Sequence, residues 1–237
     1  MIVSHQHKLI FLKPRKVAGT SFEIALSKYL TEDDIISPIA RADEKIRQRL
    51  GYTGPHNFNF AFAKLFLKHP DDIFKLFGVT PPTKFYNHMS ARLAKWYLPA
   101  EVWRDYRKIS LVRNPWERAV SLFYFRNKGE QDISKFTSFF RKNTFYLDTN
   151  YANYLVGGKN VIDFFIRCEN FEEDIRRLEG EIPALAGLWD AFKGVNAKGG
   201  TRDKTYTRQQ IFEANPEINA LVEKHNAWEI ETFGYRL

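Results

Sequence analysis

Short apolar runs alternate with amphipathic stretches along much of this chain. Residues 8–12 (KLIFL), 109–112 (ISLV) and 163–167 (DFFIR) have the length and composition of buried strands. After each run comes a loop and then an apolar pattern of helical spacing, which begins near Thr20 in the first case. These repeated strand, loop and helix units predict a single α/β domain with a central, mostly parallel sheet and helices on both faces.

The loop after the first predicted strand, residues 13–21, reads KPRKVAGTS. A loop leading from a strand into a helix directs backbone N–H groups and the positive helix end toward one point, and here cationic side chains join them. Lys16 precedes Gly19, and the hydroxyls of Thr20 and Ser21 come last. A nucleoside triphosphatase loop instead ends in Gly-Lys-Ser/Thr, whose hydroxyl holds magnesium. The order predicts a phosphate or sulfate site without an obligatory metal; a solvated basic turn is the alternative.

The loop after the second predicted strand carries a different combination of polar groups. Arg113 stands at the strand end, Pro115 suits a first helical turn, and Ser121 follows about a turn and a half into the helix. A guanidinium and a nearby hydroxyl can together hold a phosphate through charge-assisted hydrogen bonds. The second loop therefore predicts a second phosphate site.

Together the two loops resemble those of the sulfotransferases that use 3′-phosphoadenosine 5′-phosphosulfate (PAPS), in particular the carbohydrate sulfotransferases. The family's first loop reads approximately PKTGGTS and cradles the 5′-phosphosulfate; its second reads approximately VRNPWDRLVSxY and binds the 3′-phosphate. Residues 163–178 and 225–235 also resemble later parts of the family pattern. The resemblance implies a P-loop-like sulfotransferase fold and donor binding by Arg15, Lys16, Val17, Ala18, Gly19, Thr20, Ser21, Arg113 and Ser121.

The first loop departs from the family pattern at one informative place. Arg15 separates Pro14 from Lys16, where the common pattern has proline directly before lysine. Either cation could reach the transferred group, and the spacing to the Gly-Thr-Ser triplet favours Lys16.

The resemblance also implies a general base. His88 lies in the stretch FYNHMS, and a similar histidine precedes the second phosphate loop in many carbohydrate-type relatives, where it can take the proton from the acceptor hydroxyl. A neutral imidazole suits that role, because its ordinary pKa is about 6.5. A structural role for His88 stays open. The alternative bases are His56, Glu23 and Glu169, and for the two glutamates we expect structural pairing with Arg or Lys.

A basic, glycine-containing segment near the carboxyl end offers a cover for the donor. Lys198 and Arg202 lie where the family commonly places a donor-covering loop. A solvent-exposed connector is the competing interpretation.

Composition narrows the class of protein further. With 237 residues and 44% hydrophobic content, the chain can bury one core, so we expect one domain over residues 1–237, with residues 31–106 as an acceptor-side insertion.

The net charge of +8 suits a polyanionic donor, and it equally suits nucleic acid or an acidic membrane surface. Without zinc-finger spacing or an RNP-like motif, nucleic acid is not an expected partner. No early apolar stretch has the length of a signal peptide or membrane anchor, and Cys168 stands alone, so we expect a cytoplasmic protein without an intrachain disulfide.

The sequence thus predicts an enzyme that moves a sulfuryl group from PAPS to an acceptor hydroxyl and releases adenosine 3′,5′-bisphosphate (PAP). By resemblance alone, the acceptor is a carbohydrate. No metal is expected to be required, and a homo-oligomer stays open. The alternatives are a P-loop nucleotide kinase-like enzyme, which would need magnesium and ATP, and a non-catalytic protein that binds PAP or another polyanion.

Overall fold

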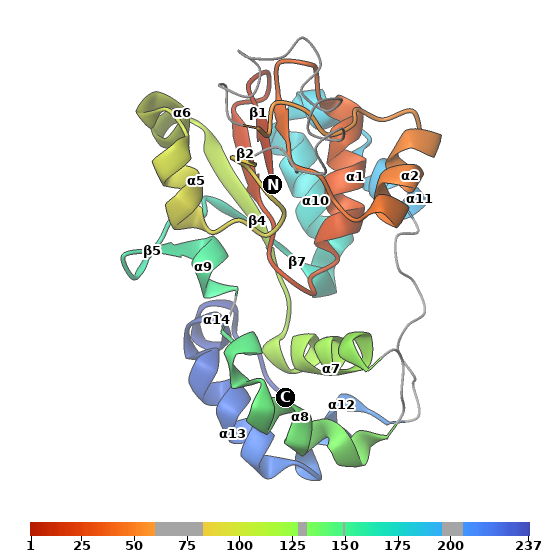
Figure 1. Cartoon of the computed structure of the whole chain (residues 1–237), viewed down its shortest axis with the longest axis vertical. Helices are drawn as coiled ribbons and strands as arrows, with labels where there is room; N and C mark the ends of the chain where they lie inside the picture. Colours follow the sequence, from red (N-terminus) through yellow and green to blue (C-terminus); the bar gives the residue numbers. More distant parts are fainter. Residues whose placement is uncertain (60–82, 128–131, 149, 196–205) are drawn as a thin grey trace, which may run out of the picture.

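The computed structural model describes residues 1–59, 83–127, 132–148, 150–195 and 206–237. At its centre is a five-stranded sheet in the order β3-β1-β2-β4-β7 (Figure 1). Its strands are β1 (Ile2–Ser4), β2 (Leu9–Leu12), β3 (Ile35–Ile36), β4 (Arg107–Val112) and β7 (Phe164–Arg167). A separate two-stranded sheet pairs β5 (Leu155–Val156) with β6 (Lys159–Asn160).

The three predicted strands, β2, β4 and β7, lie side by side and run parallel. Strand β1 is antiparallel to both β2 and β3, so the sheet as a whole is mixed. The predicted α/β fold is confirmed, and its parallel part is the part that the sequence pattern revealed. Strands β1 and β3 were not predicted, because two or three residues are too few to show a period.

Helices of two kinds accompany the sheet. The α-helices are α1 (Gly19–Leu26), α2 (Arg41–Arg49), α5 (Ala91–Tyr97), α6 (Ala100–Asp105), α7 (Pro115–Arg126), α8 (Phe136–Lys142), α9 (Tyr151–Tyr154), α10 (Phe171–Glu181), α11 (Leu188–Gly194), α12 (Arg208–Glu213), α13 (Pro216–His225) and α14 (Ala227–Phe233). The 3₁₀ helices are η1 (Ser27–Tyr29), η2 (Ile133–Lys135), η3 (Thr144–Tyr146), η4 (Cys168–Asn170) and η5 (Pro183–Leu185).

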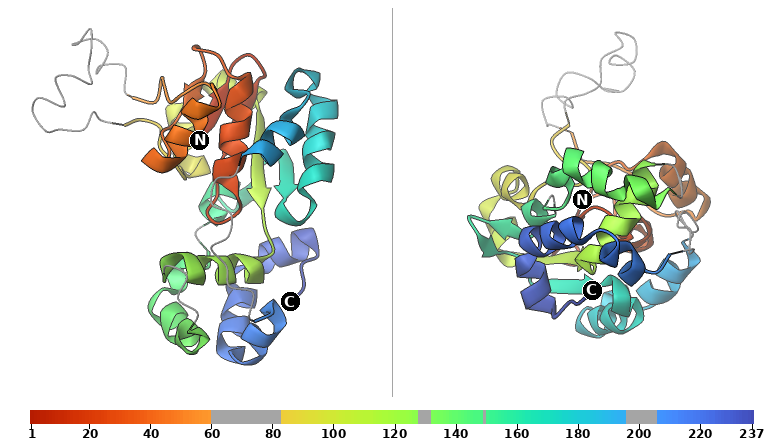
Figure 2. Two further views of the ribbon diagram at one scale, coloured as in Figure 1. Left: turned by 90° about the vertical axis from the view of Figure 1, so that its right-hand side faces the viewer. Right: turned by 90° about the horizontal axis from the view of Figure 1, so that it is seen from below.

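Each face of the sheet has its own apolar core, because successive side chains of a strand point to opposite faces. Leu9 and Phe11 of β2 enter a core shared with α1, α10 and α11. Ile10 and Leu12 enter a second core shared with α5, α6 and α9. Figures 1 and 2 show helices on both sides of the sheet. Burial on both faces explains why the parallel strands read as continuous apolar runs.

A third core lies among the helices drawn below the sheet in Figure 1. It joins α7 to α8, α12 and α13, and its centre is aromatic: the ring centroids of Phe123 and Phe136 are 5.2 Å apart, and those of Phe136 and Phe212 are 5.4 Å apart. Because α7 follows β4 directly, this core carries α7 at the carboxyl edge of the parallel strands.

The described parts of residues 31–106 supply β3, α2, α5 and α6. Residues 85, 89, 91, 94, 98 and 102 of this region are buried in the second core. The proposed acceptor-side role of this region stays a prediction. None of the helices in the described ranges is long and apolar enough to cross a membrane.

Candidate functional site

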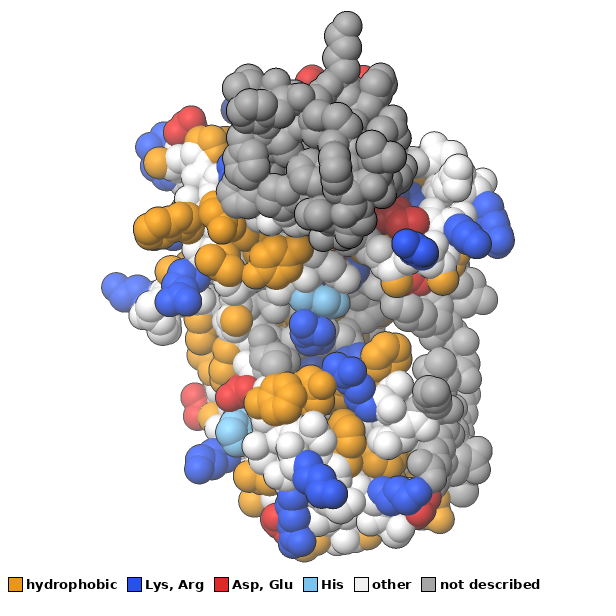
Figure 3. Space-filling view, viewed as in Figure 1, with side chains coloured by type: hydrophobic (Ala, Val, Ile, Leu, Met, Phe, Trp, Pro, Cys, Tyr) orange, Lys and Arg blue, Asp and Glu red, His pale blue; other side chains and the backbone are white. Residues whose placement is uncertain are grey.

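A cavity of about 700 Å³ opens where β2 and β4 end. Ligands of α/β proteins commonly bind at this edge, beyond the carboxyl ends of parallel strands. Figure 3 shows Lys and Arg side chains and a histidine gathered in a hollow of this face, with hydrophobic side chains on both sides. The lining residues are Lys13, Pro14, Arg15, Lys16, Ala18, Gly19, Thr20, Ser21, Asn87, His88, Arg113, Arg118, Ser121, Leu122, Phe125, Arg126, Tyr146, Asn150 and Val195.

The first loop turns sharply into α1. Lys16 and Ala18 have φ of 61° and 55°, in the left-handed region, and α1 begins at Gly19 without a side-chain cap. The first N–H groups of a helix have no partner within the helix, and they favour an anion when no side chain caps them. Gly19 is required by close packing, because a Cβ there would lie 2.9 Å from Cγ of Lys13. The start of α1, to which the structure gives no side-chain cap, therefore lies at the cavity together with the cationic side chains of the loop.

Lys13 belongs to a buried ion cluster. Its ammonium lies 2.8 Å from Oε2 of Glu23, and both side chains are almost fully buried. Burial alone would raise the pKa of Glu23, but the Met1 amine, Lys13 and Arg47 outweigh it and lower that pKa to about 2. Glu23 does not line the cavity and is paired with cations, so its structural role is confirmed and it is not placed to act as a base.

The side chains of Arg15 and Lys16 both line the cavity, and Arg15 is exposed. The Lys16 ammonium lies 4.0 Å from the ring centroid of Phe125, a cation–π contact between the first loop and α7. Val17 differs from the prediction. Its side chain is fully buried in the first core and does not line the cavity, because the turn rotates it toward the sheet. Its carbonyl accepts a hydrogen bond from Sγ of Cys168 at 3.3 Å.

The second loop meets the first within the cavity. Nη1 of Arg113 donates to the carbonyl oxygen of Lys16 at 3.3 Å, and Nη2 lies 3.4 Å from Oε2 of Glu117. Asn114 caps α7 by accepting from the N–H groups of the second and third helical residues, and Pro115 begins the helix as expected. Ser121 lines the cavity from the same helix. The two predicted phosphate sites therefore share one cavity.

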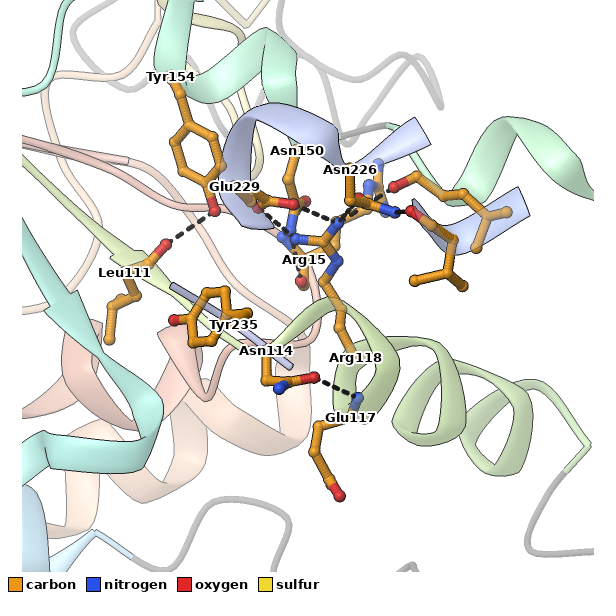
Figure 4. A network of polar contacts seen from close by, with 12 residues as sticks. Arg15, Leu111, Asn114, Glu117, Arg118, Asn150, Tyr154, Asn226, Glu229 and Tyr235 are labelled. Atoms are coloured by element: carbon orange, nitrogen blue, oxygen red, sulfur yellow. Dashed lines mark hydrogen bonds and ion pairs between the residues drawn. The ribbon is translucent and has the colours of Figure 1, made fainter. Parts of the chain in front are cut away.

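Arg118 matches the arginine of the family's second loop pattern, and its guanidinium is bonded to other residues of the protein (Figure 4). It donates to Oε1 and Oε2 of Glu229 at 2.5 and 2.8 Å, to the Leu147 carbonyl at 3.1 Å, and to Oδ1 of Asn226. Arg118 and Glu229 are both buried, so neither charge is solvated by water. This bidentate pair ties α7 to α14 and thereby fixes the helix that carries Ser121.

His88 faces the cavity from a turn at residues 86–89, with φ of 60°. Its Nδ1 lies 3.1 Å from the Lys13 carbonyl oxygen. A carbonyl accepts only from N–H, so in the neutral ring Nδ1 carries the proton and Nε2 keeps its lone pair. Burial is the largest influence, and with the charges of Lys13 and Arg15 it lowers the pKa of His88 from 6.5 to about 4. At neutral pH the imidazole is therefore an uncharged proton acceptor.

The alternative bases lie elsewhere. His56 places Nδ1 2.8 Å from the Gly54 carbonyl oxygen and Nε2 2.9 Å from that of Thr31, and it does not line the cavity. Glu169 accepts from the N–H of Asn114 at 2.7 Å and from the hydroxyl of Tyr235 at 3.2 Å. Its role is structural, although its partners are not the Arg or Lys expected. Of the described residues that line the cavity, His88 is the one with an imidazole or carboxylate.

Two predicted donor contacts, Lys198 and Arg202, lie outside the described residues. Several lining residues were missed by the sequence analysis, notably Asn150 and the aromatic pair Phe125 and Tyr146. Phe125 could have been found, because it lies four residues after Ser121 and so on the same face of α7. Asn150 gave no local signal, since its partner in the loop is 135 positions away.

Cationic side chains at the ends of parallel strands and an uncapped helix start in one cavity are typical of proteins that bind a polyanionic ligand. The model of the sulfotransferase family matches residues 1–155 of the 237, and the chain belongs to this family. It is a PAPS-dependent transferase. Comparisons with curated proteins and with solved structures gave no match. Among the described residues, no group of three or more His, Cys, Asp and Glu side chains could hold a metal ion.

Proposed function

We propose that the protein transfers the sulfuryl group of PAPS to a hydroxyl of a carbohydrate, with Lys16 and His88 as its catalytic residues and without a required metal. One observation carries the proposal: the open end of α1, the side chains of Lys16 and Arg113, and the neutral imidazole of His88 all face one cavity. Transfer needs these groups together, because the donor is anionic and the acceptor hydroxyl must lose its proton.

The cavity suits the two anionic ends of the donor. The N–H groups at the start of α1, with Thr20 and Ser21, fit the 5′-phosphosulfate, while Arg113 and Ser121 fit the 3′-phosphate. No Asp or Glu is among the described lining residues, and the nearby carboxylate of Glu117 is paired with Arg113 at 3.4 Å. Arg15 contributes positive charge at the mouth. Lys198 and Arg202 complete the assignment as predicted covering residues.

His88 and Lys16 have different roles in the transfer: one accepts a proton and the other stabilises negative charge. Nε2 of His88 accepts the hydroxyl proton as the acceptor oxygen forms its bond to sulfur and the bond from sulfur to the 5′-phosphate oxygen breaks. The Lys16 ammonium stabilises the negative charge that develops on that leaving oxygen. PAP and the sulfated acceptor are the products, and His88 returns its proton to solvent.

The carbohydrate acceptor is supported by flat apolar surfaces at the cavity. Phe125 and Tyr146 both line it, and Phe125 is 47% exposed. Exposed rings of this kind suit the apolar face of a sugar. The order of residues in the first loop also favours PAPS over Mg–ATP, because the hydroxyls of Thr20 and Ser21 follow Gly19 and the sequence has no Gly-Lys-Ser/Thr to hold magnesium.

Titration calorimetry with PAP, PAPS and Mg–ATP tests the donor, and labelled PAPS offered with neutral sugars, acidic sugars and simple phenols tests the acceptor. We expect PAP to bind in the presence of a chelator and sulfate to appear on a sugar. Tighter binding of Mg–ATP than of PAP would overturn the donor assignment in favour of a kinase-like enzyme. Tight PAP binding without transfer to any acceptor would favour a binding protein, and transfer only to phenols would overturn the carbohydrate.

A further inference from the structure

Two buried asparagines, Asn150 and Asn153, lie at the beginning and within the single turn of α9. We propose that they are positioning residues, which hold the first loop and the turn that carries His88 in the arrangement needed for transfer. The inference rests on the proposed function, because that function makes Lys16 and His88 the catalytic residues. Neither asparagine is itself assigned to the chemistry.

Asn150 is bonded to the first loop through both the oxygen and the nitrogen of its side-chain amide (Figure 4). Its Oδ1 accepts from the N–H of Arg15 at 2.8 Å, and its Nδ2 donates to the carbonyl oxygen of Arg15 at 3.0 Å. The side chain is 1% exposed, so water does not compete for these bonds. Both peptide groups that flank Arg15 are therefore fixed, one residue before Lys16.

Asn150 stands at the start of α9, but its side-chain amide bonds to the first loop and not to the helix. Asn150 occupies the N-cap position of α9, where an asparagine commonly accepts a hydrogen bond from the helix. Here it makes no cap bond, and its amide turns to Arg15 instead. Helix α9 therefore lacks the cap hydrogen bond that Asn150 could make, because the side-chain amide of Asn150 bonds to the first loop.

Asn153 makes the matching contact on the other segment. Its Nδ2 donates to the carbonyl oxygen of Met89 at 2.7 Å, directly after His88, and it is 3% exposed. The next residue, Tyr154, donates its hydroxyl to the Leu111 carbonyl oxygen of β4 at 2.9 Å. One short helix, anchored to the sheet, thus contacts both catalytic segments.

Both segments contain backbone conformations that need such support. Lys16, Ala18 and His88 have φ of 61°, 55° and 60°, and residues other than glycine rarely adopt this left-handed region of φ. Such conformations persist where surrounding contacts over-determine them, and they cluster at functional sites. The asparagine bonds fall one residue from Lys16 and one residue from His88. Loss of either amide should therefore let the adjacent catalytic residue leave its position.

The test compares Asn150→Ala and Asn153→Ala with Asn215→Ala. Asn215 is a matched control: it is 9% exposed and bonds the Ile211 carbonyl oxygen at 2.7 Å and the Thr137 hydroxyl at 2.5 Å, but it lies in the helical core. For each folded variant we would measure urea unfolding, PAP affinity by calorimetry, amide hydrogen exchange at residues 13–18 and 86–89, and the transfer rate.

The two variants should fail in different ways. Asn150→Ala should weaken PAP binding about tenfold, because PAP would then have to order the first loop on binding, and it should speed exchange at residues 13–18. Asn153→Ala should keep PAP affinity within about twofold, speed exchange at residues 86–89, and lower transfer by about 10- to 100-fold, the effect of a small misplacement of a reacting group. Asn215→Ala should lower stability without either signature.

Equal losses in all three variants, or unchanged exchange in both segments, would overturn the positioning role. If Asn150→Ala does not fold, Asn150→Ser adds no charge to the cavity and leaves a hydroxyl that can make at most one of the two bonds to Arg15, and it should show an effect of the same kind. A wild-type protein that fails to bind PAP would refute the proposed function, while the exchange data would still decide whether the asparagines hold the two segments.

Discussion

The depressed pKa of His88 gives a prediction that separates this site from an ordinary histidine. In the free protein, burial and the charges of Lys13 and Arg15 lower that pKa from 6.5 to about 4. At pH 5, an imidazole with a pKa of about 4 is roughly 90% neutral, whereas one with a pKa of about 6.5 is only about 3% neutral. The rate of a reaction that needs neutral His88 should then differ by about 30-fold between the two cases.

The assay is the pH dependence of kcat/KM for PAPS, since this quantity reports groups of the free enzyme. We expect no loss attributable to His88 between pH 8 and about 5, and a fall below about 4. NMR titration of the free protein should give the same value. Removing one cation, as in Arg15→Ala, should move the midpoint upward. An inflection near pH 6.5 in both measurements would refute the environment described for this ring.

Substitution tests the role of the same side chain. His88→Ala should lower the transfer rate by about 10²–10⁴, the usual contribution of a general base, while PAP affinity stays nearly unchanged. His225→Ala is the control, because His225 is partly buried beside Asp148 and does not line the cavity. A folded His88→Ala protein with normal turnover would remove His88 from the mechanism.

Protonation of His88 should also be visible in stability. The unfolded chain binds this proton below about pH 6.5 and the folded chain only below about 4, so the free energy of unfolding should rise as pH increases between those values. The full difference corresponds to at most ~3–4 kcal/mol, since each tenfold change in proton affinity is about 1.4 kcal/mol. Urea unfolding of the wild type and His88→Ala across this range measures it, and parallel pH profiles would contradict it.

Three further substitutions test the remaining parts of the site. Arg113→Ala should weaken PAP binding by about 1.5–3 kcal/mol and Ser121→Ala by about 1 kcal/mol, because a bond from a charged donor contributes more; calorimetry that ranks them in reverse would contradict the 3′-phosphate assignment. Lys16→Ala should depress turnover more than PAP affinity, since PAP lacks the transferred group, and equal losses in the two assays would argue against its catalytic role. Glu229→Gln should destabilise the fold by about 3–5 kcal/mol in urea unfolding by leaving the buried Arg118 without its carboxylate, and an unchanged midpoint would show that the pair is dispensable.

Local sequence signals accounted for the strands β2, β4 and β7, for the two loops that meet at the cavity and for the start of α7. These features depend on apolar runs, on a proline at a helix start and on residues a few positions apart, all of which can be seen in a short window. The same reasoning could not tell the buried Lys13, which is paired with Glu23 of the following helix, from the half-buried Lys16. It also assigned Val17 to the donor site without the turn geometry that buries its side chain.

Contacts between distant segments explain the rest. Asn150 and Arg15 are separated by 135 positions, and Arg118 and Glu229 by 111. Nothing in either local sequence identifies its partner. The folded chain brings these partners together, so such positions are found from the structure and not from spacing.

Ala18 stands where the family's loop pattern has glycine, and its φ is 55°. Alanine in this conformation costs roughly 1–2 kcal/mol, a penalty that glycine avoids. A methyl group at positive φ disfavours the observed turn, so contacts around the loop must hold it in place. The two hydrogen bonds between Asn150 and Arg15 are contacts of this kind. In this chain, the shape of the first loop is therefore maintained at the expense of folding stability.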